Sequence, residues 1–150
     1  MEFRQSKKFA KELKNFLKKY RSLAGDLDLL QDVLRTHPQG FGSIHWNRLY
    51  VSDDQTVTIF KVRLSCKAMK GESRFRLVYA YNQSTKELLF IDFIEIYFKG
   101  EKTNNDQSLI EGYLNMSLEG IFDEDRSKYF LSLCLQRVFL CILRSEIKSL

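Results

Sequence analysis

The chain has 150 residues, of which 44% are hydrophobic and 13% aromatic, so it can bury one core and has the size of a single domain. Its net charge of +5 is local: residues 1–25 hold eight Lys and Arg against two Glu, and residues 61–76 hold six against one Glu. Such clusters usually contact nucleic acid, an acidic partner or a membrane surface, with an ordinary solvated face as the alternative. The odd number of cysteines, without a C-x-x-C spacing, disfavours a disulfide framework, and two isolated histidines disfavour a zinc site, so no metal and no cofactor are expected.

The N-terminal segment predicts a short strand over residues 2–5 and then a helix that Ser6 caps and that ends near Tyr20. Apolar residues repeat at helical spacing along one side of this helix: Phe9, Leu13, Phe16, Leu17 and Tyr20. The opposite side carries a basic row that either faces solvent or contacts RNA phosphates: Lys7, Lys11, Lys14, Lys18 and Arg21.

A second helix follows closely. Gly25-Asp26 is expected to break the first helix and to cap the second, which ends before Pro38. Two short helices joined in this way form an αα-hairpin. Residues 37–56 predict an irregular connection with a short strand at 44–51.

The most informative segment is residues 60–81, which read F-K-V-R-L-S-C-K-A-M-K-G-E-S-R-F-R-L-V-Y-A-Y. Apolar and basic residues alternate, so a hairpin of strands at 56–67 and 74–81 would have one apolar and one basic face. With a turn centred on Lys70-Gly71, residue 65 faces residue 76, and five side chains share the basic face: Lys61, Arg63, Lys67, Arg74 and Arg76. Like charges across a sheet are unfavourable without an anion between them, which predicts a phosphate- or carboxylate-bearing ligand.

The rest of the chain predicts a turn at 82–85, a strand at 87–98 apolar enough for the middle of a sheet, and a helix at 106–115. The order (β)ααβββα indicates an α+β fold with a small antiparallel sheet and the αα-hairpin packed on one face. Residues 129–143 predict an extra C-terminal helix that is too short and too polar to span a bilayer. This helix would pack on its own domain, cover the basic groove or join a second copy in a homodimer. The opening residues lack the apolar segment of a signal peptide, so a cytoplasmic location without membrane contact is expected.

Four segments resemble the RelE/ParE superfamily of bacterial toxins, specifically its RelE-like and HigB-like mRNA-cleaving members. They are K-K-F-A-K-E-L-K-N-F-L-K-K-Y-R-S-L with D-L-D-L-L (7–23 and 26–30), F-K-V-R-L (60–64), R-F-R-L-V-Y (74–79) and I-Y-F-K-G-E-K (96–102). The resemblance implies a toxin domain over residues 1–114 and a C-terminal helical extension over 115–150. Two departures are Arg74-Phe75 in place of the family's Gly-Tyr, and Gly100 where a second basic residue is frequent.

The resemblance implies a metal-independent endoribonuclease, the toxin of a type II toxin–antitoxin system, which cleaves mRNA on the ribosome by attack of a 2′-hydroxyl on phosphate. Arg76 would clamp the phosphate, Lys61 and Arg63 match the paired basic residues of the family's first sheet strand with Lys61 as the base, and Lys99 would neutralise or protonate the leaving group. Further RNA contacts are expected from Lys67, Lys70, Arg74, Tyr97 and Lys102. The implied protein partner is a cognate acidic antitoxin.

Two alternatives remain open at this stage. ParE-like relatives share the fold but inhibit DNA gyrase without nuclease chemistry, and an inactive toxin remnant or binding module would explain Gly100 and the unusual tail. The cluster of Lys61, Arg63 and Arg76 favours the nuclease, because a gyrase inhibitor does not need it.

Overall fold

The computed structural model describes residues 1–70, 73–83 and 89–118, so the expected helix at 129–143 lies outside the described residues. The elements in chain order are β1 (Glu2–Gln5), α1 (Lys7–Lys19), α2 (Leu23–Thr36), β2 (Trp46–Val51), β3 (Val57–Leu64), the short 3₁₀ helix η1 (Lys67–Met69), β4 (Phe75–Asn82), β5 (Phe90–Phe98) and α3 (Gln107–Leu118). The chain divides into two compact units, Met1–Ile110 and Glu111–Leu150. The described part of the second unit is the rest of α3, and the candidate site lies wholly in the first unit.

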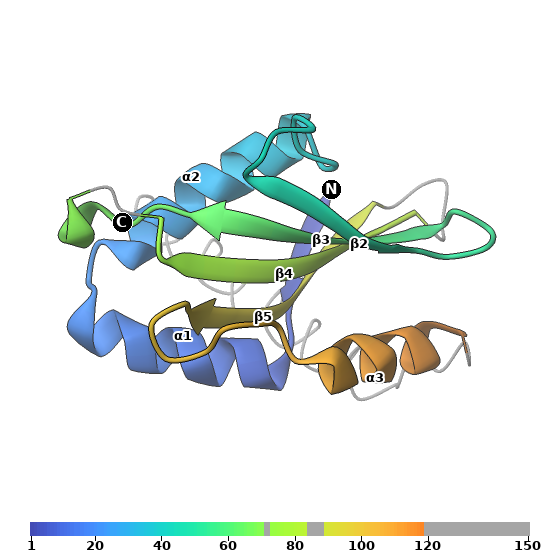
Figure 1. Cartoon of the computed structure of the whole chain (residues 1–150). Coiled ribbons are helices and arrows are strands. Elements are labelled where there is room, and N and C mark those ends of the chain that lie inside the picture. Colours follow the sequence, from blue (N-terminus) through green and yellow to red (C-terminus); the bar gives the residue numbers. More distant parts are fainter. Residues whose placement is uncertain (71–72, 84–88, 119–150) are drawn as a thin grey trace, which may run out of the picture. The chain divides into compact units, whose positions relative to one another are not determined.

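The first unit is an α+β structure, as predicted (Figure 1). Its five strands form one sheet in the order β1-β5-β4-β3-β2. Strands β2 to β5 are an antiparallel meander, whereas β1 pairs parallel to β5, from Glu2 opposite Phe90 to Gln5 opposite Phe93. The sheet is therefore mixed, because the helical hairpin carries the chain from one edge of the sheet to the other before the meander begins.

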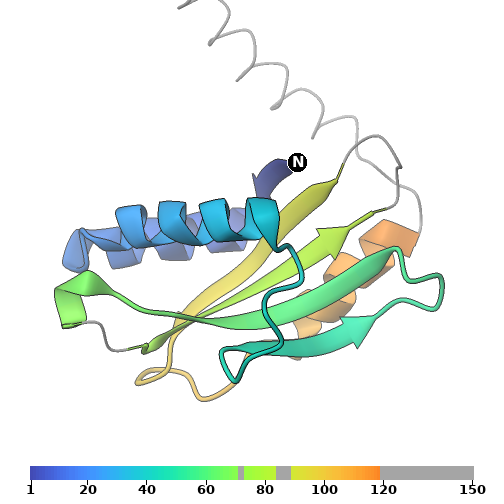
Figure 2. The same cartoon turned by 90° about the horizontal axis from the view of Figure 1, so that it is seen from above.

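The core lies between one face of the sheet and the two helices α1 and α2 (Figure 2). The predicted apolar side of α1 packs here: Phe9 is fully buried and its ring stacks on Phe93 with 5.2 Å between centroids. Burial of each such ring contributes about 1.5–3 kcal/mol to stability. This packing fixes which face of the sheet α1 and α2 cover, and the loop after β5 contacts the opposite face through Asn105 and Asp106.

Ser6 caps α1, as predicted. Its hydroxyl oxygen accepts a hydrogen bond from the backbone N–H of Phe9 at 3.0 Å and its O–H donates to the carbonyl of Ile94 at 2.8 Å. One side chain therefore satisfies a free donor of the helix and joins its start to β5.

The predicted helix break at Gly25-Asp26 is wrong. Helix α2 begins at Leu23, after Ser22, and contains both residues. The carboxylate of Asp26 accepts hydrogen bonds from the Ser22 hydroxyl and from the backbone N–H of Lys67, each at 3.1 Å. A carboxylate is favourable in the first turn of a helix, so Asp26 belongs inside this turn and also holds η1 against it.

The β3–β4 register differs from the prediction by two residues. Arg63, and not residue 65, lies opposite Arg76, and β3 ends at Leu64. The chain leaves the ladder here because η1 turns away, and Lys67 therefore does not extend the basic face as expected. A shift of two residues leaves every side chain on its predicted face.

Candidate functional site

A row of polar side chains crosses the face of the sheet that lies opposite to helices α1 and α2. Arg63 on β3 lies directly opposite Arg76 on β4, which lies opposite Tyr97 on β5. The pairing of β2 with β3 extends one residue before the start of β2, because the backbone N–H of Arg63 donates to the carbonyl of His45 at 2.9 Å. His45, Arg63, Arg76 and Tyr97 thus occupy one line of register positions, called the arginine row below. Their strand neighbours Leu64, Phe75 and Leu77 belong to the core on the other face.

Lys61 lies on the same face of the sheet as Arg63, two residues before it on β3. It sits opposite Val78, and its Nζ donates to the side-chain oxygen of Asn105 at 3.2 Å. The prediction that Lys61, Arg63 and Arg76 share one face is therefore confirmed. The cause is strand alternation, which holds whatever the register.

Arg76 is the most enclosed cation of the row, with 9% of its surface exposed. Its Nη1 donates to the carbonyls of Ser73 at 2.6 Å and Phe75 at 3.0 Å, which orients the guanidinium. Burial and the neighbouring charge of Arg63 lower the pKa of Arg76, which nevertheless stays charged because an arginine titrates so high. Among the described residues, neither Arg63 nor Arg76 forms an ion pair with a carboxylate. Within residues 1–70, 73–83 and 89–118, the pair therefore lacks a carboxylate partner.

Tyr97 closes one end of the row. Its side chain is almost completely buried, and burial together with the nearby Glu95 raises the pKa of Tyr97, while Arg76 acts in the opposite direction. The phenol therefore keeps its proton at neutral pH and offers a hydrogen-bond donor rather than a base.

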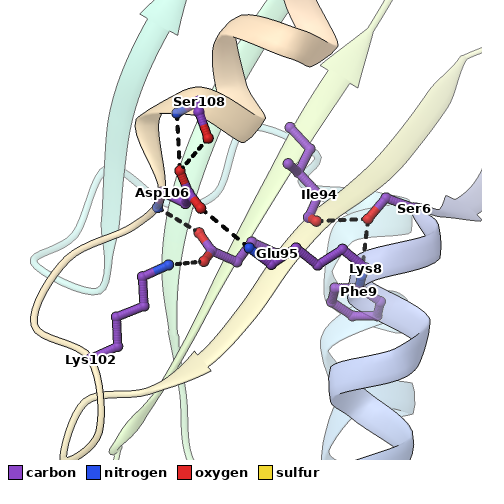
Figure 3. A network of polar contacts seen from close by, with 8 residues as sticks. All are labelled: Ser6, Lys8, Phe9, Ile94, Glu95, Lys102, Asp106 and Ser108. Carbon is purple, nitrogen blue, oxygen red and sulfur yellow. Dashed lines mark hydrogen bonds and ion pairs between the residues drawn. The ribbon is translucent and has the colours of Figure 1, made fainter.

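A buried polar network supports the row from the loop that follows β5 (Figure 3). Glu95 has 1% of its surface exposed; it accepts the backbone N–H of Asp106 at 2.9 Å and pairs with the ammonium of Lys102. The ammonium of Lys8 on α1 reaches the other side of Asp106, at 3.2 Å. A buried carboxylate requires such partners, so the position of this loop is fixed by Glu95.

The pKa values of Asp106, within this network, and Glu12, beside it, are shifted in opposite directions. The hydroxyl and N–H of Ser108 and the ammonium of Lys8 lower the pKa of Asp106 to about 2. Burial raises the pKa of Glu12, and the charges of Glu95 and Asp106 add to the effect against the opposing lysines. Its Oε2 is buried and has no hydrogen-bond partner among the described residues.

The remaining predicted residues lie at three places. Lys99 and Arg74 are exposed and face each other one ladder step beyond β4 and β5, joined by a 2.9 Å bond from the Lys99 N–H to the Arg74 carbonyl. Lys67 and Lys70 belong to η1 and its end, away from the strands of the row. The ammonium of Lys102 is engaged by Glu95 and lies 5.6 Å from the centre of the Tyr97 ring.

A glycine at position 100 has a steric reason. A Cβ atom there would lie 2.6 Å from the Phe98 ring, closer than real contacts allow. A side chain at this position would therefore require the half-buried ring of Phe98 to shift.

Sequence reasoning missed His45, Asn105 and Glu95. The residue types gave no signal, because the importance of His45 follows from its register with Arg63, and that of Glu95 and Asn105 from the path of the loop after β5. A correct β2–β3 register would have found His45.

No match for this chain is found among protein-family models, curated proteins or solved structures. Within the described ranges, no helix is long and apolar enough to cross a lipid bilayer.

Proposed function

We propose that the protein is a metal-independent endoribonuclease, the toxin of a type II toxin–antitoxin system, and that it binds the scissile phosphate on the arginine row. The observation that carries this proposal is the direct opposition of Arg63 and Arg76 without a carboxylate partner among the described residues. Two facing guanidinium groups repel each other, and a phosphate between them relieves this repulsion and can bind bidentately.

The reaction that fits this surface is attack of a ribose 2′-oxygen on the adjacent phosphorus. The O2′–P bond forms, the bond from phosphorus to the 5′-oxygen breaks, and the products are a 2′,3′-cyclic phosphate and a 5′-hydroxyl. Arg63 and Arg76 stabilise the additional negative charge of the pentacoordinate transition state. One group must accept the 2′-hydroxyl proton and another must protonate the leaving oxygen.

The candidates for these proton transfers surround the arginine row. Lys61 is the proposed base and Lys99 the proposed acid. His45 is a further candidate for either role, because its side chain is exposed at the end of the row and an imidazole carries both a donor and an acceptor nitrogen. Tyr97 remains a neutral donor to a phosphate oxygen.

Partners follow from the same charges. The substrate is single-stranded mRNA, on the ribosome in the RelE-like manner, and a cognate acidic antitoxin would neutralise the toxin by covering these cations. Arg74 and Lys99 extend the positive surface past the row, where they meet neighbouring phosphates.

The test measures cleavage of a labelled RNA by the purified chain with and without ribosomes. Arg76→Ala and Arg63→Ala are expected to lower the cleavage rate about 100-fold or more, as loss of a transition-state donor does. Arg48→Ala is the matched control: Arg48 is also an exposed strand arginine, but it lies opposite Phe60, whose ring belongs to the core face. The control should cleave like the wild type.

Expression in cells separates the alternatives. Growth arrest with cut mRNA that is lost in Arg76→Ala and Lys61→Ala supports the nuclease. Arrest that survives both substitutions contradicts it and supports a ParE-like inhibitor of gyrase, and the absence of arrest together with the absence of cleavage supports an inactive binding module.

A further inference from the structure

Two serine hydroxyls lie where β3 ends and β4 begins, beside the arginine row. The Oγ atoms of Ser65 and Ser73 are 2.7 Å apart. Ser65 follows Arg63 by two residues, and the backbone carbonyl of Ser73 accepts from Nη1 of Arg76 at 2.6 Å. The serine pair therefore adjoins the guanidinium pair, and the same two chain segments supply both.

The serine pair keeps one O–H group that its mutual hydrogen bond does not use. Each hydroxyl can donate once, so only one of the two O–H groups is directed at the partner oxygen. Across residues 1–70, 73–83 and 89–118, neither Oγ atom has another hydrogen-bond partner. Ser65 is exposed and Ser73 half-buried, so the second O–H can donate to a ligand.

Arg76 also has donors to spare. A guanidinium carries five N–H groups, and the two on Nη1 donate to the carbonyls of Ser73 and Phe75. Nε and Nη2 carry the other three, which have no acceptor within the part of the chain that the structure describes. Because the two carbonyls already orient this enclosed guanidinium, less entropy is lost when a ligand binds to it.

The arrangement of these donors favours a phosphate over a carboxylate as the ligand. The two oxygens of a carboxylate lie in one plane and match two N–H groups of a single guanidinium. Here the donors come from two guanidinium groups and a hydroxyl, on two strands that face each other. The tetrahedral oxygens of a phosphate offer lone pairs outside a single plane, and its charge relieves the repulsion between Arg63 and Arg76.

We propose that Ser65 and Ser73 are phosphate-binding residues, whose unused O–H donates to an oxygen of the phosphate held by Arg63 and Arg76. The identification of this phosphate as a link of an RNA chain rests on the proposed function. The recognition of a phosphate group by the serine pair does not, because the same donors would also bind inorganic phosphate.

The test measures phosphate binding without any cleavage. The full ¹⁵N-labelled chain is titrated with inorganic phosphate and with a 2′-O-methyl dinucleotide, which has one phosphodiester and no 2′-hydroxyl nucleophile. Shifts of the amide signals of Ser65, Ser73 and Arg76 report binding. The double variant Ser65→Ala/Ser73→Ala should bind both probes about 10-fold more weakly, as loss of a hydrogen bond to a charged group does. Both serines are replaced because, in a single variant, the remaining hydroxyl is released from its partner and can still donate.

Two further variants separate ligand binding from a structural role. Ser65→Thr/Ser73→Ala returns one hydroxyl at an exposed position and should recover most of the affinity. Thr36→Ala is the control, because it removes an exposed hydroxyl at the end of α2, where Oγ1 donates to the Val33 carbonyl at 3.0 Å, and it should bind like the wild type. Urea unfolding of each variant should show that the double variant loses affinity while its stability is kept.

The two probes also identify the source of the phosphate. Tighter binding of the dinucleotide supports an RNA phosphate at this site. Tighter binding of inorganic phosphate contradicts that assignment, although the role of the serines stands if their removal weakens it.

Equal affinity of the wild type and the double variant for both probes overturns the inference, and so does a loss of affinity that is matched by a loss of stability. Phosphate binding that depends on the serines in a protein that cleaves no RNA would support the inference and contradict the proposed nuclease. RNA cleavage by a protein whose phosphate binding does not depend on the serines would do the reverse.

Discussion

Lys61 and Asn105 are joined by a hydrogen bond of 3.2 Å that links the middle of the sheet to the loop after β5. The amide oxygen of Asn105 accepts from the ammonium and so limits where Lys61 can point. The loop is itself held by Glu95, through the Asp106 N–H and Lys102. Glu95 on β5 thus holds the loop whose Asn105 positions Lys61 on β3, two strands away.

If Lys61 takes the 2′-hydroxyl proton, Asn105 tunes its reactivity. Asn105→Asp puts a negative charge beside the ammonium and favours its charged form, so the rising limb of the pH–rate profile should move to higher pH. Asn105→Ala should lower the cleavage rate with little change in RNA affinity. Profiles that coincide for the wild type and Asn105→Asp would exclude Lys61 as the base.

Removal of Lys102 should destabilise the first unit through Glu95. Lys102→Ala leaves a carboxylate that is 1% exposed with a single backbone donor, at a cost of about 3–5 kcal/mol in the free energy of unfolding. The double variant Glu95→Ala/Lys102→Ala should be less destabilised than the sum of the two single variants. Urea unfolding of the set measures this, and strictly additive losses would mean that the pair does not interact.

Glu12→Gln should stabilise the protein at pH 7. The pKa of Glu12 is raised in the folded state, so the folded chain prefers the protonated carboxyl, and this favourable contribution exists below the ordinary value of 4.5 and is lost as pH rises through the folded value. A neutral amide avoids the cost of a buried charge, so the gain should appear at pH 7 and vanish near pH 4. Thermal unfolding at both values, with the exposed Glu101→Gln as control, checks it.

The contribution of Asp106 to stability should depend on pH in the opposite sense to that of Glu12. Its pKa is lowered from 3.8 to about 2, so its contribution to stability is present above pH 4 and is lost as pH falls through 2. Asp106→Asn should be less stable than the wild type at pH 6, and the difference should narrow between pH 4 and pH 2. A gap of constant size over that range would show that the charge of Asp106 does not contribute.

Gly40→Ala and Gly25→Ala form a matched pair with opposite outcomes. A Cβ at Gly40 meets Trp46 at 2.4 Å in a left-handed conformation, so the variant should be destabilised and its tryptophan emission shifted. Gly25 lies in α2 with nothing within 4 Å of its Cβ position, and alanine there should stabilise by about 0.5–1 kcal/mol. Equal stabilities of the two variants would contradict the close approach of Gly40 to Trp46.

Local patterns predicted the elements and faces of this protein but not its registers. The alternation around Lys61, Arg63 and Arg76 places them on one face because side chains two apart share a face, and the structure confirms this. The same alternation is unchanged by a register shift of two residues, so it could not decide whether residue 63 or 65 lies opposite Arg76. The answer depends on where η1 docks against Asp26, which is a tertiary contact.

Asp26 shows a second limit of sequence reasoning. A Gly-Asp pair is typical of helix ends, but this aspartate lies within the first turn of α2, where it binds Ser22 and Lys67. The parallel pairing of β1 could not be read from four residues either. It is set by partners far along the chain, such as Arg4 with Asp92.

The parallel pairing of β1 also orders events during synthesis. Arg4 and Asp92 are 88 positions apart, and β1 has no neighbour in the sheet until β5 exists. Contacts over such separations close late in folding. A nascent chain would thus carry Arg63 and Arg76 on an incomplete sheet. Tyr97 and the loop that positions Lys61 would join them only after the ribosome has made most of the first unit.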